Sequence, residues 1–233
     1  MHRFLHLKQI VLSNIILNHI IHLIGEIMKN IVINHWMNII KRNKDFDDVK
    51  LAEIEYGLTG LYLTFSKLFV IALIALIMGI IKEMIIFLLL YNVLRTLSFG
   101  IHATKSWICL ISSTIIFIGF PFLCIKIELN IIIKIILGLS GILLMLKNSP
   151  ADTKKRPIVN PKRRFVYKIL STAFATLYVV ISVIIKNTFI SNCLILSLLL
   201  QNILISPMTY KLFKQPYNNY KKFLETNQNF KLL

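Results

Sequence analysis

Long apolar windows, each able to cross a membrane as a helix, dominate this sequence. A transmembrane helix needs about 20 mostly apolar residues, and lipid offers no partner for unpaired backbone groups. We therefore predict an all-α, polytopic membrane helical bundle. Two of the windows are short and polar-flanked, near Lys82 and Lys134, so four spans plus two re-entrant segments is the alternative to six spans. The six windows lie at about residues 58–80, 83–101, 107–125, 130–146, 166–185 and 188–206.

The basic residues lie mainly in the loops on one side of these windows. The chain carries 27 Lys and Arg and a net charge of +17, but only 16% of its residues are charged. With the N-terminus in the cytoplasm and six spans, 22 basic residues face the cytoplasm and three face outward. This asymmetry predicts a cell-membrane protein with both termini cytoplasmic. It also indicates the lipid bilayer, and not a nucleic acid, as the partner of the positive charge.

Three regions follow from the same pattern. We expect residues 1–57 to form a cytoplasmic or interfacial amphipathic region, because Asn14, Asn18, His22 and Glu26 form one polar stripe at i, i+4 spacing. The acidic residues at 45–48 indicate that a more regular helix begins there. Residues 58–206 form the expected transmembrane bundle, and residues 207–233 a cytoplasmic C-terminal tail.

A histidine and a cysteine seven residues apart, His102 and Cys109, stand between two apolar windows. A thiol becomes a nucleophile when a nearby base takes its proton. One straight helix would separate the pair by about 10 Å, whereas a base must come within about 3 Å. We therefore expect Gly100 to end one helix and Ser106 to cap the next, so that Cys109 lies in a first turn, where the helix dipole and Lys105 favour the thiolate.

Structural explanations for the same residues stand beside this catalytic one. A cysteine in a membrane helix often only fills space, and an interfacial histidine often only donates to a carbonyl. Asn92 and Asp152 are the candidates to orient His102. Ser112 and Ser113 could line an oxyanion site within the catalytic turn at 95–113, although membrane serines commonly bond to their own backbone.

A basic loop at 147–168 is the second unusual segment. Topology and anionic lipid explain much of its charge. Lys154, Lys155 and Arg156 could also dock an acidic peptide through charge-assisted hydrogen bonds. We predict no metal and no cofactor, because His19, His22 and Glu26 lack a closing fourth ligand and His102 with Cys109 would need two more.

Taken together, these residues resemble the accessory gene regulator B (AgrB) family. Four stretches carry the resemblance, which covers about residues 28–224. They are Glu53-Ile-Glu-Tyr-Gly-Leu58, the core from Arg95 through Gly100-Ile-His102-Ala103 to Cys109, Pro150-Ala-Asp-Thr-Lys-Lys-Arg-Pro157, and the tail from Pro207 to Tyr217. Family members are usually nearer 200 residues, so residues 1–27 are expected to be an extension, or Met28 the true start.

The resemblance implies a membrane cysteine endopeptidase that processes an AgrD-type quorum-sensing propeptide. Cys109 would be the nucleophile and His102 its base, and an acyl-thioester would then close into a thiolactone or lactone. Arg95 and Gly100 match further motif positions that would shape the site or meet substrate. The resemblance also implies a homodimer. The alternative is a non-catalytic peptide exporter or membrane scaffold, which Cys109→Ser would leave nearly intact.

Overall fold

The computed structural model describes residues 25–42, 46–101, 106–154 and 156–231, and it is 83% helical. No β-strand occurs in these described ranges, which confirms the all-α expectation. The chain divides into two compact units, Met1–Val70 and Ile71–Leu233. The expected division at residues 57 and 206 stays a prediction.

The first unit contains a helix at 25–42 and most of α2 (Asp48–Ile77). The carboxylate of Asp47 accepts the backbone N–H of Lys50 at 2.8 Å, which satisfies one of the unpaired donors at the start of α2. A helix with an acidic first turn therefore begins where the sequence predicted one. Of the polar stripe, only Glu26 falls in the described residues, and it pairs with Lys29 at 3.3 Å.

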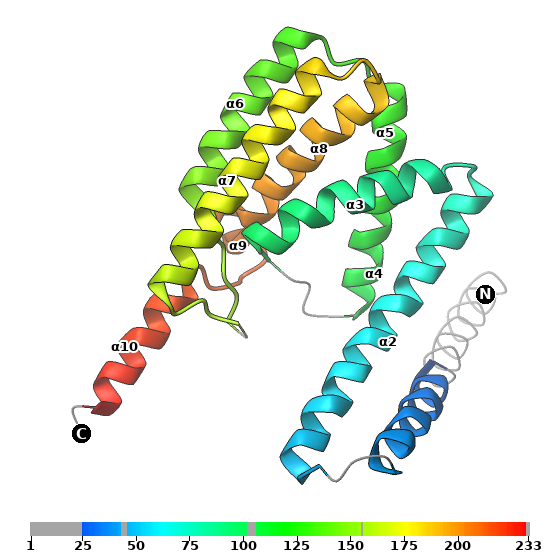
Figure 1. Ribbon diagram of the computed structural model, residues 1–233, viewed down its shortest axis with the longest axis vertical. Coiled ribbons are helices and arrows are strands. Elements are labelled where there is room, and N and C mark those ends of the chain that lie inside the picture. The colour runs from blue at the N-terminus through cyan, green and yellow to red at the C-terminus, as the bar shows by residue number, and fades with distance from the viewer. Residues whose placement is uncertain (1–24, 43–45, 102–105, 155, 232–233) are drawn as a thin grey trace, which may run out of the picture. The chain divides into compact units, whose positions relative to one another are not determined.

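The second unit contains the remaining helices (Figure 1). Asparagine side chains set several of their starts, because Asn130, Asn160 and Asn187 each accept the backbone N–H three residues ahead. The helices are α3 (Ile81–Ser98), α4 (Ser106–Thr114), the π-helical turn η1 (Ile115–Gly119), α5 (Phe120–Lys126), α6 (Ile131–Asn148), α7 (Pro161–Ile184), α8 (Thr188–Ile205), α9 (Pro207–Leu212) and α10 (Asn219–Lys231).

The segments α4, η1 and α5 follow one another without a break from Ser106 to Lys126. Pro121 lies inside this helical run and is buried. A proline ring collides with the carbonyl four residues earlier and cannot donate to it. The wider π-helical turn immediately before Pro121 accommodates this conflict, so the helix continues through the proline.

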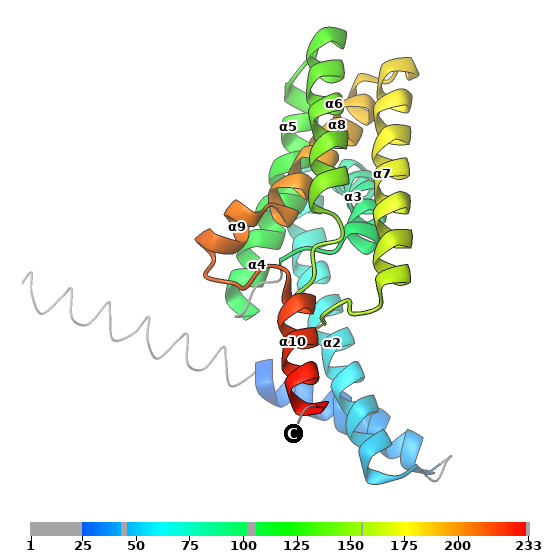
Figure 2. The same ribbon diagram turned by 90° about the vertical axis from the view of Figure 1, so that its left-hand side faces the viewer.

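Within the described part of the chain, five helical segments are long and apolar enough to cross a membrane: Asp48–Ile77, Ile108–Lys126, Ile131–Asn148, Pro161–Ile184 and Thr188–Ile205. The window expected at 83–101 forms α3, which is not among them. Lys82 and Glu83 in its first turn and Arg95 in its last turn lower its hydropathy. Figure 1 shows α3 running obliquely to α7 and α8, both of which it contacts. Figures 1 and 2 show α6 and α7 running along one another.

Helix α8 lies at the centre of the unit and contacts α3, α5, α6 and α7. Of the residues in its apolar window, 61% are buried, which is the largest share among the five spans. Small residues let the helices approach: a Cβ on Gly138 would come within 2.7 Å of Val179, and one on Gly141 within 2.9 Å of Leu198. The core of the unit is therefore built around α8, and the other spans turn apolar faces outward.

Candidate active site

The chain leaves α3 through a turn at Phe99 and Gly100. Phe99 has a φ of 58° and Gly100 a φ of 114°, both in the left-handed region that favours glycine. These angles end α3 at Ser98 and redirect the backbone towards His102. Helix α4 begins separately at Ser106. Hence α3 and α4 are two helices, and residues 95–115 do not form one straight helix, because the described residues 99–101 leave the helical path.

The guanidinium group of Arg95 holds this turn by its carbonyl groups. Its Nη1 donates to the carbonyl of Phe99 at 2.6 Å, and its Nη2 donates to the carbonyls of Gly100, at 3.4 Å, and Ile101. Hydrogen bonds from a charged donor are stronger than neutral ones, and the planar fork fixes direction as well as distance. One side chain thus holds three consecutive carbonyls of the segment that immediately precedes His102.

Gly100 makes this contact sterically feasible. A Cβ at this position would lie 2.5 Å from Arg95 Nη1 and 3.0 Å from the carbonyl oxygen of Leu204. The first distance is shorter than Cβ atoms tolerate, so a side chain here would force the guanidinium away from the carbonyls that it binds, and the second is a tight contact with backbone. Glycine is therefore favoured here both by the backbone angle and by the position of the guanidinium.

Helix α8 and the loop after α6 hold the same 98–101 segment from other directions. The amide of Gln201 donates to Ser98 Oγ at 2.6 Å and to the Phe99 carbonyl at 2.7 Å. The N–H of Gly100 donates to the carbonyl of Ala151 at 2.8 Å, and the N–H of Ala151 donates to the carbonyl of Ser98 at 3.0 Å. The 98–101 segment is thus bonded to α3, to α8 and to the loop, although it forms no regular element.

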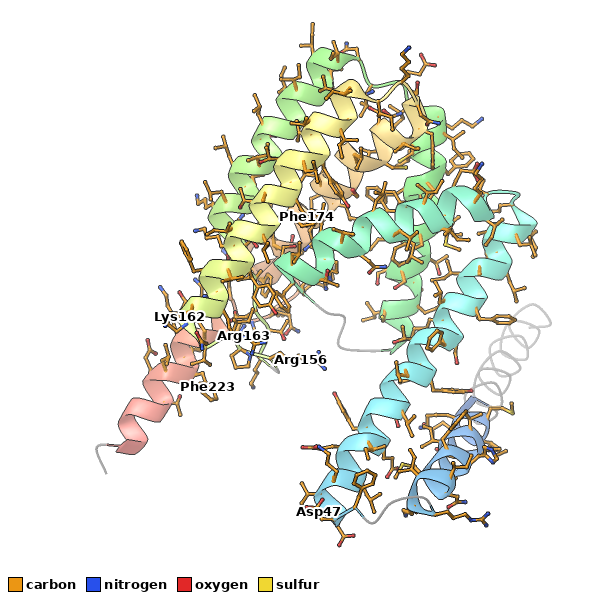
Figure 3. All side chains as sticks on the ribbon, viewed as in Figure 1. Asp47, Arg156, Lys162, Arg163, Phe174 and Phe223 are labelled. Atoms are coloured by element: carbon orange, nitrogen blue, oxygen red, sulfur yellow. The ribbon has the colours of Figure 1, made fainter. Side chains whose placement is uncertain are left out.

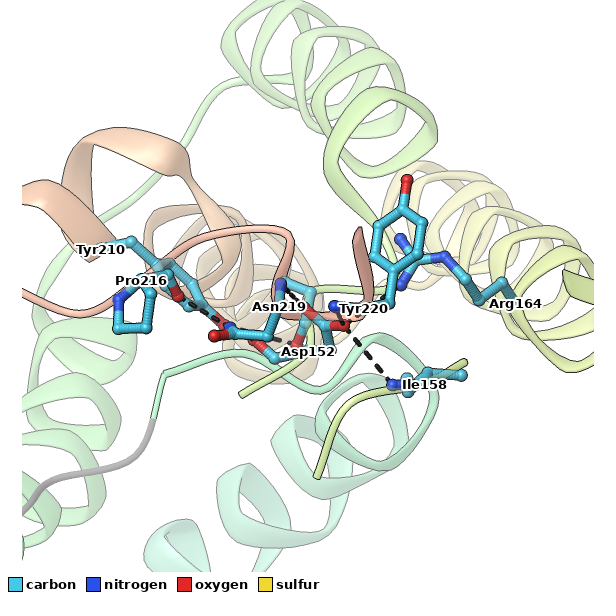
Figure 4. A network of polar contacts seen from close by, with 8 residues as sticks. Asp152, Ile158, Arg164, Tyr210, Pro216, Asn219 and Tyr220 are labelled. Atoms are coloured by element: carbon cyan, nitrogen blue, oxygen red, sulfur yellow. Dashed lines mark hydrogen bonds and ion pairs between the residues drawn. The ribbon is translucent and has the colours of Figure 1, made fainter. Parts of the chain in front are cut away.

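Asp152 connects the loop to the C-terminal helix (Figure 4). Its buried carboxylate accepts the backbone N–H groups of Asn219 at 3.0 Å and Tyr220 at 2.9 Å, which are the first residues of α10. It also pairs with Arg164 at 3.5 Å, and the Arg164 guanidinium stacks on the Tyr220 ring at 3.6 Å. A carboxylate at a helix N-terminus is favoured by the helix dipole, so Asp152 attaches α10 to the loop.

Tyr210 completes this network from α9. Its hydroxyl donates to the carbonyl of Asp152 at 3.0 Å. A tyrosine hydroxyl is protonated at neutral pH, and burial raises the pKa of this one further above its ordinary value of 10.0, so it remains a donor in alkaline solution as well. Among the described residues the Asp152 carboxylate binds α10 and Arg164. Because His102 lies outside the described residues, the expectation that Asp152 orients it stays a prediction.

Cys109 lies at the start of α4 and is half-buried. Ser112 Oγ donates to the carbonyl of Cys109 at 3.1 Å, which is the backbone bonding expected as the alternative to an oxyanion role. Ser113 lies one residue further on the same helix and is also half-buried. His102 and Lys105 lie outside the described residues, so the His102–Cys109 pairing stays a prediction.

Of the three basic residues singled out in the loop, Lys154 and Arg156 are exposed, and Lys155 lies outside the described residues. The structure adds residues that the sequence reasoning did not select, namely Gln201, Arg164, Tyr210 and Asn219. The sequence could have indicated Gln201, because a polar amide inside an apolar window must find buried hydrogen-bond partners. Asn219 lies in a polar tail where nothing in the sequence distinguishes it.

Comparison with known proteins gives matches along most of the chain. The family model described as Accessory gene regulator B matches residues 33–205. An AgrB-like protein of Clostridium acetobutylicum is 30% identical over 80% of this chain and 90% of its own length. An AgrB-like protein of Listeria monocytogenes is 31% identical over 76% and 87%, and the accessory gene regulator protein B of Staphylococcus epidermidis is 29% identical over 79% and 93%. No solved structure matches the chain.

Proposed function

Because the chain belongs to the accessory gene regulator B family, we propose that it is a membrane cysteine endopeptidase that cleaves and cyclises an AgrD-type propeptide. One observation carries the proposal beyond family membership. Arg95, Gln201 and Ala151 hold the segment that ends one residue before His102, while the half-buried Cys109 lies at the start of the next helix. A backbone fixed from three directions is what a positioned catalytic base needs.

The reaction divides between two residues. His102 accepts the thiol proton of Cys109, and the sulfur attacks the scissile carbonyl carbon of the propeptide. The C–N bond then breaks, the new amine takes the proton from His102, and the N-terminal segment stays on Cys109 as a thioester. An internal Cys or Ser of the peptide attacks that thioester, which forms the ring and returns the proton to Cys109. Because one activated ester is exchanged for another, ring closure to a thiolactone needs no ATP.

The other candidate residues fall into two roles. Arg95 and Gly100 are proposed to position the backbone before His102, because the guanidinium binds backbone carbonyls and Gly100 leaves room for it. Lys154, Lys155 and Arg156 are proposed to meet the acidic portion of the propeptide. Ser113 is proposed to face the substrate from the first turns of α4.

The distribution of charge supports an orientation in the cell membrane. The loop after α6 and the α9–α10 region are rich in Lys and Arg, whereas Lys82, Lys126 and Lys186 lie at the other turns between helices. By the positive-inside rule the basic end faces the cytoplasm. We propose that both termini are cytoplasmic, and we retain the homodimer as part of the proposal.

The test is intact-mass analysis of the purified chain with the propeptide encoded beside its gene. We expect an adduct equal to the N-terminal peptide segment, which Cys109→Ala abolishes and Cys193→Ala retains. Cys193 is the matched control because it is fully buried in α8. His102→Ala should slow adduct formation by about 100-fold or more, the usual contribution of general base catalysis. Cleavage that persists in Cys109→Ala would overturn the proposal, and peptide transport without cleavage would favour the exporter alternative.

A further inference from the structure

A cleft lies between the basic loop and the C-terminal helix, away from Cys109 on α4. Its volume is about 410 Å³. The loop contributes one wall, and the start of α10 contributes the other. The lining includes Lys154 and Pro157 from the loop, Pro216 from the turn before α10, and Asn219, Lys222 and Phe223 from α10.

The two walls supply charge of one sign with apolar surface between. Lys154 and Lys222 are exposed and come from different elements, and the ring of Phe223 is 46% exposed. Figure 3 shows Arg156, Lys162, Arg163 and Phe223 in this same region, around the first turns of α7 and α10. No carboxylate lines the cleft among the described residues. Asp152, which binds the lining residue Asn219, is buried and paired with Arg164, and Glu225 is an exposed carboxylate on α10 outside the lining.

We propose that this cleft binds an acidic peptide segment that also carries an apolar side chain. Carboxylates of the peptide pair with Lys154 and Lys222, and its apolar side chain packs on Phe223 between them. The proposal rests on the proposed function in one respect: it identifies the peptide as the substrate of the same enzyme. It adds α10 to the basic loop as a substrate-binding element.

The position of the cleft connects it to the candidate active site. Asn219 lines the cleft and its backbone N–H donates to Asp152, while the adjacent Ala151 pairs with Ser98 and Gly100. A peptide bound there lies against the loop that holds the segment before His102. The cleft can therefore anchor one part of a substrate while another part reaches the catalytic turn.

An anionic lipid headgroup is the competing occupant of a basic site beside a membrane. A phosphate group would need only the two ammonium groups. The cleft also presents Phe223, Pro157 and Pro216. This combination matches a chain of alternating charged and apolar side chains better than it matches a headgroup.

The test measures binding of a fluorescein-labelled peptide of glutamate, glycine and a single leucine by fluorescence anisotropy. The full chain with Cys109→Ala is held in nanodiscs of neutral lipid, so that binding is measured without cleavage. We expect Lys222→Glu to weaken binding by about tenfold or more, since it replaces a charged hydrogen bond with repulsion. Lys221→Glu is the matched control, because Lys221 is exposed on the same helix but does not line the cleft. Lys222→Arg should restore binding.

The apolar contact is tested by a second matched pair. Phe223→Ala should weaken binding several-fold, and Leu224→Ala, which changes the next exposed residue outside the cleft, should not. Equal losses in Lys221→Glu and Lys222→Glu, or equal binding of a glutamine peptide, would overturn the proposal. So would a loss of peptide binding in Lys222→Glu that appears only in nanodiscs containing phosphatidylglycerol and not in neutral ones, which would assign the cleft to lipid.

The outcomes also separate this proposal from the proposed function. If cleavage depends on Cys109 but Lys222→Glu shows no selective loss of peptide binding, only the proposal about the cleft is refuted. If the peptide binds selectively but cleavage does not depend on Cys109, the proposal about the cleft stands and the proposed enzyme mechanism is refuted.

Discussion

At the scale of single residues, the pair Arg95 and Gly100 determines the path of the backbone before His102. The guanidinium takes the space that a Cβ on Gly100 would occupy, and it binds carbonyls on both sides of that glycine. Neither residue can change size without displacing the other. The segment is therefore more sensitive to a single methyl group than its lack of regular structure would indicate.

Gly100→Ala should lower the cleavage rate by about 100-fold, because a displacement near 1 Å of a catalytic group costs about that much. Its positive φ alone should cost about 1–3 kcal/mol of stability. Gly60→Ala is the control, since Gly60 lies inside α2 and a Cβ added there would have nothing within 4 Å. The measurement is the rate of acyl-enzyme formation by mass spectrometry, together with the thermal unfolding midpoint. Similar rates in the two variants would contradict the steric argument.

The sequence alone identified Arg95 and Gly100 but could not describe how they act on each other. Their contact depends on the φ of Gly100 and on Leu204, which lies about 100 residues away along the chain. Asp152 shows the same limit in the opposite sense. Its place in the basic loop made it a candidate partner of His102, which stays a prediction. Its hydrogen bonds to the start of α10 are a second role that no local pattern could indicate.

At the scale of elements, the loop after α6 connects the 98–101 segment to the start of α10. Ala151 pairs with the 98–101 segment on one side, and Asp152 holds the start of α10 on the other. Tyr210 bonds to the backbone of the same loop from α9. The loop is thus bonded to three neighbouring elements through two adjacent residues.

Asp152→Asn should loosen α10. Loss of the negative charge weakens the bonds from the Asn219 and Tyr220 N–H groups, and a hydrogen bond to a charged group is worth about 1.5–3 kcal/mol. We expect amide hydrogen exchange at these two positions to accelerate by about 10- to 100-fold. Glu225→Gln removes an exposed carboxylate from the same helix and should leave exchange unchanged. Equal exchange in both variants would show that Asp152 does not attach α10.

Helix positions followed from the sequence to within a few residues where a long apolar window meets a capping residue, as at Asn130 and Asn187. The beginning of α7 was less accurate, since it starts at Pro161, several residues before its apolar window. Helix α3 differs most. Its apolar side chains pack against α8 and α7 as well as facing outward. Hydropathy does not distinguish side chains that face protein from those that face lipid, so it did not reveal the oblique course of α3.

At the scale of the whole molecule, the number of crossings depends on α2 and α3. The apolar centre of α3 runs only from Met84 to Leu94, because charged residues flank it. At 1.5 Å per residue this centre is about 16 Å long, about half of the hydrocarbon core. If α2 crosses the membrane, α3 must return the chain through protein-lined surroundings. If α2 does not cross, α2 and α3 form the re-entrant pair, in place of the segments near Lys82 and Lys134 expected from the sequence, and the other four spans remain.

A cysteine at Met78, in the turn between α2 and α3, distinguishes these arrangements. Both termini in the cytoplasm and six passages place this turn outside, so Met78→Cys should react with a membrane-impermeant maleimide added to intact cells. The background is Cys109→Ala, in which the remaining cysteines, Cys124 and Cys193, are buried. Lys186→Cys, in the exposed turn between α7 and α8, should react in the same way, and Lys221→Cys on α10 only after permeabilisation. Lys186→Cys and Lys221→Cys report the orientation independently of Met78→Cys. If they react as expected but Met78→Cys reacts only after permeabilisation, the C-terminus is cytoplasmic and the chain has four passages plus a re-entrant pair, not six passages.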